Sequence, residues 1–306
     1  MKAIQYTAFG GSEVLQLNQI EKPEINDDEV LIKIKATTVN PMDMKFRSGL
    51  LQKGMPIELP YTPGLDVSGV VEKTGKNVKR IKKGDNFFGT TFGGTYAEYI
   101  NLNENQITIN PKNTPNEDSA ALAIPLTTAY SILVENGQLS SGQKVLIHGA
   151  GGGVGTIALQ MAKAIGAYVI GTASGKGLDL IKKLGADELI DYKSQDFSTL
   201  VSDVDVVVDL VGGETQAKSF EILKKGGKLL STVQPPSEEL AKKFDIEARF
   251  VFSKPSFQKL DFGKKMVEEG KIKTQIAQVM KLENAARAQD LVSSGGINGK
   301  IVLEIS

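Results

Sequence analysis

The sequence predicts an α/β protein with two domains, a partly open β-barrel and a doubly wound parallel sheet. Short strand patterns separated by turn signals fill residues 1–121, as in a barrel-like β-domain. From Lys144 onward, strand and helix patterns alternate, which is typical of a parallel sheet covered by helices. We expect residues 1–121 and 256–306 to form the β-domain and residues 122–255 to form the parallel-sheet domain.

The composition of the 306-residue chain argues against several classes of protein. Lys and Arg together number 36, as do Asp and Glu, so no basic excess suggests a nucleic-acid partner. No apolar run approaches the roughly 18 residues that a membrane span needs, and Met1 opens on a strand pattern rather than a secretory leader. The chain has no Cys, which removes disulfides and thiolate chemistry. We expect a cytoplasmic enzyme without membrane or nucleic-acid partners.

In the first part of the chain, strand-forming residues over 30–36, 66–72 and 96–100 predict three strands. Small and apolar residues over 119–134 then predict a buried helical region that is broken at Pro125. These elements would complete the N-terminal part of the β-domain and lead into the parallel sheet.

In the second part, the strand patterns are rich in β-branched residues, so both faces of their sheet should be covered. The expected strands are 144–148, 168–172, 188–192, 204–210, 227–232 and 247–252, and the expected helices are 157–165, 178–184, 262–269 and 283–292. A closing strand pattern at 299–305 follows without enough residues for a third domain. We therefore expect it to rejoin the N-terminal β-domain.

Five glycines follow the strand pattern 144–148 within seven residues, and a helix pattern begins at once. Strand, glycine turn and helix in this order indicate a dinucleotide-binding site; a flexible surface loop is the alternative. Ala150 would make the tight turn, Gly152 would let the backbone approach a pyrophosphate, and Gly155 would let the helix pack on the strand. The expected cofactor contacts in the turn are Ala150, Gly151, Gly152, Gly153, Val154 and Gly155.

The residues after the next strand pattern favour NADPH over NADH. NAD-binding folds usually place an acid about twenty residues after the glycines, where it binds the ribose 2′-hydroxyl. Here the segment contains Ser174 and Lys176, and no acid precedes Asp179. A hydroxyl and an ammonium suit a 2′-phosphate. The alternative is that Lys176 is only a solvated turn lysine.

Several segments together resemble a zinc-independent medium-chain dehydrogenase/reductase, in particular the quinone oxidoreductases and the enone or alkenal reductases. The segments that carry the resemblance are 39–49, 63–71, 125–130, 144–155, 184–187 and 209–213. The resemblance implies a GroES-like β-domain interrupted by a Rossmann domain, and commonly a homodimer, for which the sixth Rossmann strand offers an edge. Zinc-using relatives need Cys and His ligands, but this chain has no Cys and only His148. We expect His148 to be structural or to line the cofactor.

The resemblance also assigns contacts to the rest of the cofactor. Tyr192 would approach the 2′-phosphate, and five further residues would lie near the nicotinamide, each with ordinary packing as the alternative. These five are Thr127, Val211, Gly212, Ser231 and Val233.

The chemistry implied is hydride transfer from NADPH to a quinone or an α,β-unsaturated carbonyl, which pushes negative charge onto oxygen. Lys45 could stabilise that oxygen. Quinone oxidoreductases have tyrosines at the positions of Lys45 and Leu51, whereas plant enone reductases tend to have lysine at the first of them. Asn40 is the second candidate for a catalytic contact. The alternatives are a surface lysine and an Asn-Pro turn.

An apolar substrate wall is expected from Phe46, Leu51, Phe92 and Tyr130, any of which could instead be core. Two other functions stay open. A strict NADPH:quinone reductase would use the same fold, although Lys45 disfavours it. A non-enzymatic NADPH-binding or sensor protein would bind the cofactor without turnover.

Overall fold

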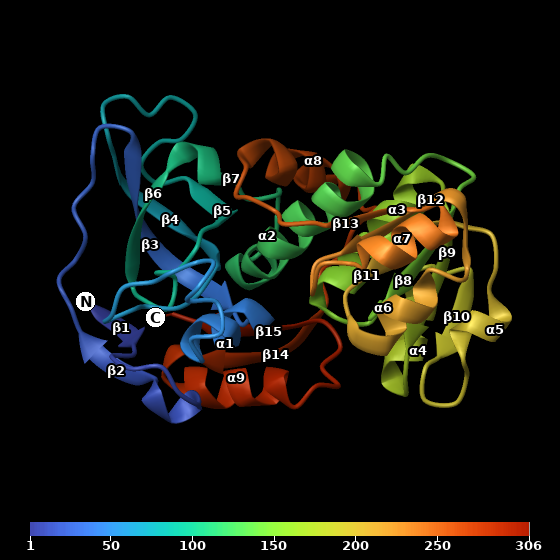
Figure 1. Ribbon diagram of the computed structural model, residues 1–306. Coiled ribbons are helices and arrows are strands. Elements are labelled where there is room, and N and C mark those ends of the chain that lie inside the picture. The colour runs from blue at the N-terminus through green and yellow to red at the C-terminus, as the bar shows by residue number, and fades with distance from the viewer. Residues whose placement is uncertain (306) are drawn as a thin grey trace. The chain divides into compact units, whose positions relative to one another are not determined.

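The computed structural model describes residues 1–305 and divides into two compact units. The first, called the β-unit here, comprises residues 1–124, 255–265 and the chain from residue 275 onward. The second, the α/β unit, comprises residues 125–254 and 266–274. Figure 1 shows both, with each unit built around its own sheet. The sequence assigned residues 266–274 to the β-domain, but in the structure they group with the α/β unit.

The β-unit contains a strongly bent sheet whose strands come from both ends of the chain. Its order is β14–β15–β3–β4–β5–β7, and β6 also pairs with β3. These strands are β3 (Glu29–Thr38), β4 (Asp66–Thr74), β5 (Asn86–Thr90), β6 (Tyr99–Asn103), β7 (Ile107–Ile109), β14 (Ile276–Lys281) and β15 (Lys300–Glu304), and a separate hairpin joins β1 (Lys2–Gln5) to β2 (Gln16–Gln19). Val302 of β15 pairs antiparallel with Thr38 of β3, which confirms that the closing strand rejoins the N-terminal domain.

Apolar side chains on the inner face of this sheet form the core of the β-unit. Ile32, Val67 and Phe87, from three neighbouring strands, are completely buried, together with Leu303 of β15. The helices of the unit are α1 (Pro41–Arg47), α9 (Ala285–Ser293) and the first part of α8 (Phe257–Glu268), with single turns at Ser12–Val14, Glu104–Gln106 and Leu282–Asn284. Helix α1 packs against α9, which fixes the segment that follows β3.

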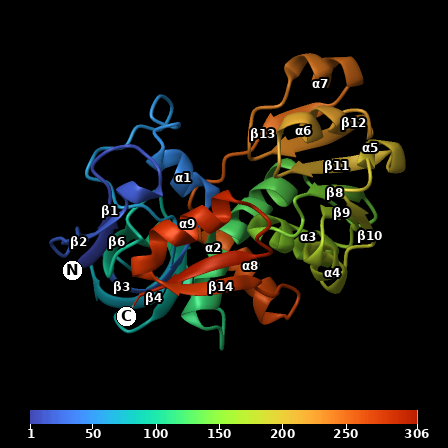
Figure 2. The ribbon, with the colours of Figure 1, turned by 90° about the horizontal axis from the view of Figure 1, so that it is seen from below.

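The α/β unit is a six-stranded parallel sheet in the order β10–β9–β8–β11–β12–β13. Counted within the unit, this is the order 3-2-1-4-5-6 of a Rossmann fold. The strands are β8 (Lys144–His148), β9 (Tyr168–Ala173), β10 (Glu188–Asp191), β11 (Val204–Asp209), β12 (Leu223–Ser231) and β13 (Glu247–Phe250). Figure 2 shows α3 and α4 on one face of the sheet and α5, α6 and α7 on the other. These helices are α3 (Gly153–Ile165), α4 (Lys176–Lys183), α5 (Phe197–Leu200), α6 (Gly213–Ser219) and α7 (Glu238–Phe244).

One predicted helix break is wrong. Helix α2 (Asn116–Tyr130) runs through Pro125 and continues as a π-helix over Ser131–Asn136. Proline removes only one helical hydrogen bond, and the buried residues on either side of it, Leu122 and Leu126, favour continuation. The strand expected over 96–100 begins only at Tyr99, because the preceding residues form bends and a single bridge at Ala97.

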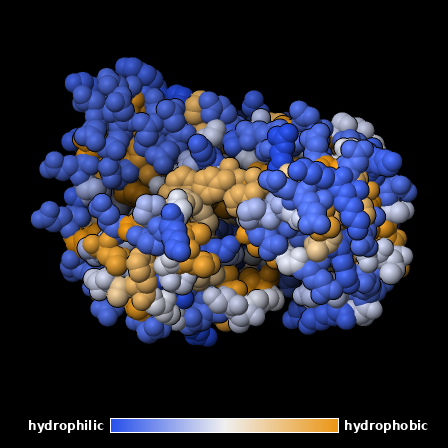
Figure 3. Space-filling view, viewed as in Figure 1, coloured by the Kyte–Doolittle hydropathy of each residue, from blue (hydrophilic) through white to orange (hydrophobic). Residues whose placement is uncertain are grey.

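The face shown in Figure 3 is mostly hydrophilic, with smaller apolar patches. Within residues 1–305, no helix is long and apolar enough to cross a membrane.

The side chain of Gln160 on α3 accepts a hydrogen bond from the backbone N–H of Lys273 (2.9 Å) and donates one to its carbonyl (3.0 Å), which ties the segment 266–274 to the α/β unit.

Candidate active site

The glycine turn of the α/β unit lies between β8 and α3, where the sequence placed it. Gly149 has φ = +70°, a left-handed conformation that favours glycine. A Cβ at Gly155 would lie 2.2 Å from the carbonyl oxygen of Gly149 and 2.7 Å from the Cα of Ala150, so helix and turn touch there. A Cβ at Gly152 would meet only the Gly149 oxygen, at 3.4 Å. Gly155 therefore serves packing, whereas Gly152 leaves an open approach for a ligand.

The first turn of α3 supplies hydrogen-bond donors at this open approach. Gly152 precedes the helix in an extended conformation, and the first helical bond runs from the N–H of Thr156 to its carbonyl (2.9 Å). The N–H groups of Gly153, Val154 and Gly155 consequently have no partner within the helix. N–H groups at a helix N-terminus, combined with the helix dipole, suit the phosphates of a dinucleotide. The turn thus fits a pyrophosphate.

A second group of donors lies at the ends of β9 and β10. The Ser174 hydroxyl donates to the Tyr192 hydroxyl (2.9 Å), and the Tyr192 side chain is exposed. Lys176 is exposed at the first position of α4. The carboxylate of Asp191 accepts from the backbone N–H of Lys193, so that acid is engaged locally. Because the Ser174 hydrogen is used in this bond, the Tyr192 hydroxyl and the Lys176 ammonium are the donors left for a phosphate group.

His148 is a structural residue at the end of β8. Its Nε2 lies 3.0 Å from the Ser219 hydroxyl, and that hydroxyl donates its own hydrogen to the Thr215 carbonyl. Nε2 must therefore carry the proton, and Nδ1 accepts from the Thr172 hydroxyl (3.3 Å). Burial lowers the pKa of His148 to about 4, partly opposed by the charge of Asp209. The imidazole is neutral near pH 7 and both nitrogens are engaged.

The residues expected near the nicotinamide follow the ends of β11 and β12, which pair through Asp209 and Ser231. The Asp209 carboxylate accepts from the N–H groups of Val211 (3.0 Å) and Gly212 (2.8 Å). The Ser231 hydroxyl accepts from the N–H of Val233 (3.2 Å). This role of Asp209 was not predicted from the sequence. An acid at the end of a buried strand could have indicated it, because a buried carboxylate needs hydrogen-bond donors such as these N–H groups.

Thr127, the other residue expected near the nicotinamide, is buried on α2. Its carbonyl accepts a hydrogen bond from the Ser253 hydroxyl (3.0 Å), and the Ser131 hydroxyl lies 3.1 Å from the same Ser253 oxygen. Tyr130, expected in the substrate wall, is partly buried on the same helix and belongs to the α/β unit, as does Thr127.

In the β-unit, Asn40 joins a buried polar cluster that sequence reasoning missed. Its Nδ2 donates to the Asp66 carboxylate (2.8 Å), and its Oδ1 accepts from the Lys300 ammonium (2.6 Å). Lys300 also lies 3.3 Å from Asp66 and donates to the Val39 carbonyl (3.1 Å). The Thr38 hydroxyl donates to Asp66 as well. A lysine within the apolar pattern of 300–303 was the signal that could have revealed this cluster.

Asp43 is a second buried acid near Asn40. Its carboxylate accepts from the backbone N–H groups of Asn40 (2.8 Å) and Gly64 (3.0 Å). Burial raises its pKa to about 7, although these hydrogen bonds and the charge of Lys300 oppose the increase. The carboxylate holds the start of α1 against the loop that contains Gly64.

The other predicted residues of the β-unit lie on α1 and the loops beyond it. Lys45 is partly buried, its carbonyl accepts from the Ser48 hydroxyl (3.2 Å), and its ammonium makes no hydrogen bond or ion pair with any residue in the range 1–305. Phe46 is buried, and its ring centroid lies 6.0 Å from that of Tyr61, whose hydroxyl donates to the Phe92 carbonyl (3.0 Å). Leu51 is partly buried and Phe92 is exposed. Tyr61 was missed because irregular loop structure carries no periodic signal.

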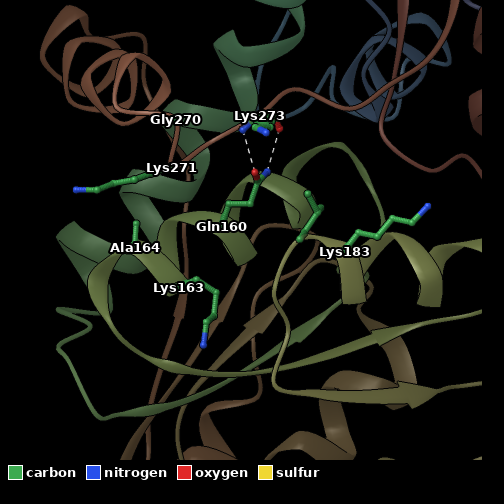
Figure 4. Close-up of a pocket in the computed structure, with 8 residues that line it drawn as sticks. Gln160, Lys163, Ala164, Lys183, Gly270, Lys271 and Lys273 are labelled. Atoms are coloured by element: carbon green, nitrogen blue, oxygen red, sulfur yellow. Dashed lines mark hydrogen bonds between the residues drawn. The ribbon is translucent and has the colours of Figure 1, made fainter.

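A further pocket of about 370 Å³ lies in the α/β unit, lined by Lys163, Lys183, Lys271, Lys273 and Gln160 among others. Figure 4 shows the ammonium groups of Lys163, Lys183 and Lys271 pointing in different directions. Lys163 is paired with Asp187 (2.7 Å) and Lys271 with Glu269 (2.7 Å). These lysines therefore do not form a convergent set of donors.

Comparison with known proteins identifies the family. The chain matches the model of the alcohol dehydrogenase GroES-like domain over residues 26–112 and the zinc-binding dehydrogenase model over residues 184–303. The quinone oxidoreductase of Sus scrofa is 34% identical over 322 aligned positions, covering 99% of this chain and 97% of that protein. The chain belongs to the quinone oxidoreductase family. This confirms the resemblance inferred from the sequence, and the α/β fold with GroES-like and Rossmann parts.

Two other relatives widen the family comparison. The 2-methylene-furan-3-one reductase of Solanum lycopersicum is 40% identical over 252 positions, which cover 77% of this chain and 64% of that protein. The Escherichia coli quinone oxidoreductase, solved in complex with NADPH, is 28% identical and has a TM-score of 0.91, with full coverage of both chains. Within residues 1–305, no group of three or more His, Cys, Asp or Glu side chains could hold a metal ion.

Proposed function

We propose that this member of the quinone oxidoreductase family is an NADPH-dependent reductase of quinones or α,β-unsaturated carbonyls. The observation that carries the proposal is the glycine turn at β8–α3, open at Gly152, combined with the exposed Lys176 ammonium and the hydrogen-bonded Ser174 and Tyr192 hydroxyls. The names of the relatives support both substrate classes, one a quinone oxidoreductase and one a furanone reductase. No zinc is required in this proposal, since the chain has no Cys and only one His.

The preference for NADPH rests on the donor set at the ends of β9 and β10. In this proposal the first turn of α3 binds the pyrophosphate, and Lys176, Ser174 and Tyr192 bind the 2′-phosphate. When bound, NADPH supplies the hydride for the reduction. Relative to the aspartate or glutamate of an NAD site, these side chains favour the phosphorylated cofactor.

Replacing Lys176 tests this assignment. We expect Lys176→Ala to raise the KM for NADPH about tenfold, because one charged contact worth roughly 1.4 kcal/mol is lost. The KM for NADH should stay within about twofold of the wild-type value. Lys182→Ala, an exposed lysine farther along α4, is the matched control and should change neither value. Equal increases for the two cofactors would contradict a 2′-phosphate site at Lys176.

In the β-unit, Lys45 is the proposed donor to the substrate oxygen. Its ammonium has no partner among residues 1–305, so its hydrogens are available to a ligand. A cation near the oxygen that gains charge stabilises the transition state more than the ground state. Phe46, Leu51 and Phe92 supply apolar surface on the same unit. Tyr130 stays a predicted substrate contact.

Activity assays with Lys45→Met test the role of this lysine. We expect turnover of a short-chain enone with NADPH to fall about a hundredfold, of the order observed when one oxyanion donor is removed, with unfolding free energy changed by less than about 0.5 kcal/mol. Lys53→Met, an exposed loop lysine, is the control.

A naphthoquinone is assayed in parallel: turnover of quinone alone by the wild type would favour a strict quinone reductase. Tight NADPH binding with no turnover of either substrate would favour a binding protein.

A further inference from the structure

The buried cluster around Asn40 carries an inference that rests on, and deepens, the proposed function. Lys300 has three ammonium hydrogens and three acceptors: the Val39 carbonyl, Asn40 Oδ1 and the Asp66 carboxylate. One oxygen of the Asp66 carboxylate accepts from Asn40 Nδ2, Lys300 and the Thr38 hydroxyl, and the other accepts from the N–H of Ile124 (2.6 Å). The Lys300 ammonium therefore has no hydrogen left for a ligand, and the Asp66 carboxylate, which is completely buried, is engaged through both oxygens.

These two charges determine the orientation of the Asn40 side chain. An amide has a carbonyl oxygen and an NH₂ group of nearly the same shape, and only its partners decide which atom lies where. A flipped amide would place NH₂ hydrogens against the Lys300 ammonium and the amide oxygen against the Asp66 carboxylate. Both contacts would be repulsive in a site where Lys300 is 8% and Asp66 0% exposed. The amide is therefore held in one orientation.

The backbone of Asn40 is fixed as well. Its N–H donates to Asp43, and the residue begins helix α1, whose first position is Pro41. After the bond to Asp66, one hydrogen of Nδ2 remains, and Asn40 keeps 5% of its surface exposed. The residue is thus a fixed single donor at the start of the helix that carries Lys45.

We propose that Lys300 and Asp66 are positioning residues that fix the Asn40 amide, so that Asn40 donates its remaining N–H to an oxygen of the bound substrate or cofactor. The recognised chemistry is an oxygen acceptor: the carbonyl or quinone oxygen of the substrate, or a hydroxyl of the cofactor. Asn40 would then select ligands that present a hydrogen-bond acceptor over ligands that present a donor. Lys300 and Asp66 would act only through Asn40.

A double-mutant cycle tests this dependence. Removing one charge alone would leave the other buried and unpaired, so Lys300→Met and Asp66→Asn are combined in one variant. We expect this variant and Asn40→Ala each to lower kcat/KM for the enone about tenfold, and the triple variant to show no further loss. Effects that multiply to about a hundredfold would overturn the proposal, because Lys300 and Asp66 would then act independently of Asn40.

The kinetic constants distinguish the two possible acceptors. A tenfold loss confined to enone kcat/KM, with the KM for NADPH unchanged, assigns the acceptor to the substrate; a parallel rise in the KM for NADPH assigns it to the cofactor. The control is the variant that combines Lys163→Met with Asp187→Asn, a more exposed ion pair of the α/β unit, which should change neither constant.

A spectroscopic readout keeps the proposal separate from the proposed function. The side-chain amide resonance of Asn40, assigned by its absence in Asn40→Ala, should be protected from solvent exchange in the wild type and lose at least about tenfold of that protection in the charge-free variant. An unchanged amide resonance would overturn the positioning role. If the wild type reduced neither enone nor quinone, the proposed function would fail, and the amide resonance would still decide the orientation.

Discussion

The two units build their polar sites from different parts of the chain. In the α/β unit, the donors at the glycine turn are backbone N–H groups, and one continuous segment, 149–155, supplies them. In the β-unit, the cluster consists of buried side chains from three distant segments, Asn40, Asp66 and Lys300. A site made of backbone depends on the absence of side chains, whereas a site made of buried charges depends on every member. The two sites should therefore fail in different ways.

The largest expected effect concerns Gly155. Gly155→Ala places a methyl group 2.2 Å from the Gly149 carbonyl oxygen, and the backbone on both sides cannot yield cheaply. We expect unfolding free energy to fall by about 3 kcal/mol or more, measured by urea denaturation. Gly152→Ala is the matched control, since its methyl meets only one atom at 3.4 Å. It should fold normally yet bind NADPH at least about tenfold more weakly in a fluorescence titration. Equal stability of the two variants would contradict the different roles of these glycines.

An effect of comparable size concerns the buried ion pair. Lys300→Met removes the ammonium and leaves the Asp66 carboxylate buried without its cationic partner. We expect a loss of about 3–5 kcal/mol in unfolding free energy. Combining Lys300→Met with Asp66→Asn should restore more than half of that loss, because no charge is then left unpaired. If the single and double variants were equally unstable, packing rather than charge would hold the cluster together.

The smallest expected effect is a difference in pH dependence between the units. Asp43 has a pKa raised to about 7, so the stability it contributes is full below the unfolded value and is lost as pH rises through about 7. His148 has a pKa lowered to about 4, so its contribution is present above the unfolded value near 6.5 and is lost as pH falls through about 4. For each residue, the pH dependence of the unfolding free energy should differ between the wild type and a variant that lacks the titrating group.

Urea denaturation of Asp43→Asn and His148→Gln over a range of pH measures these shifts. Relative to the wild type, Asp43→Asn should gain about 2.5 kcal/mol between pH 5 and pH 8, and His148→Gln should gain about 2.5 kcal/mol between pH 7 and pH 4.5. Asp203→Asn, at an exposed position with φ = +56° that Asn tolerates, is the control for a change of charge alone. Gains by both variants in the same direction of pH would contradict the costs of burial, which oppose a deprotonated Asp43 and a protonated His148.

The same contrast explains what the sequence could predict. The Rossmann order and the turn at 149–155 were predictable because period, glycine spacing and chain order are local features. The return of β15 to the N-terminal sheet followed from counting residues. The network of Asn40, Asp66 and Lys300 could not be predicted, because its members are brought together only by β3, β4 and β15. Pro125 misled because burial of α2 outweighs one missing hydrogen bond.

The position of β15 in the β-unit has a consequence for biosynthesis. The six strands of the α/β sheet are complete once residue 250 has been synthesised, but the sheet of the β-unit lacks β15 until residue 304. At ~5–20 residues per second, the ribosome needs about 3–11 s for the intervening 54 residues. During that interval Asp66 has no Lys300 to neutralise it and Val302 has not yet paired with β3. The buried ion pair is therefore among the last interactions that a newly made chain can form.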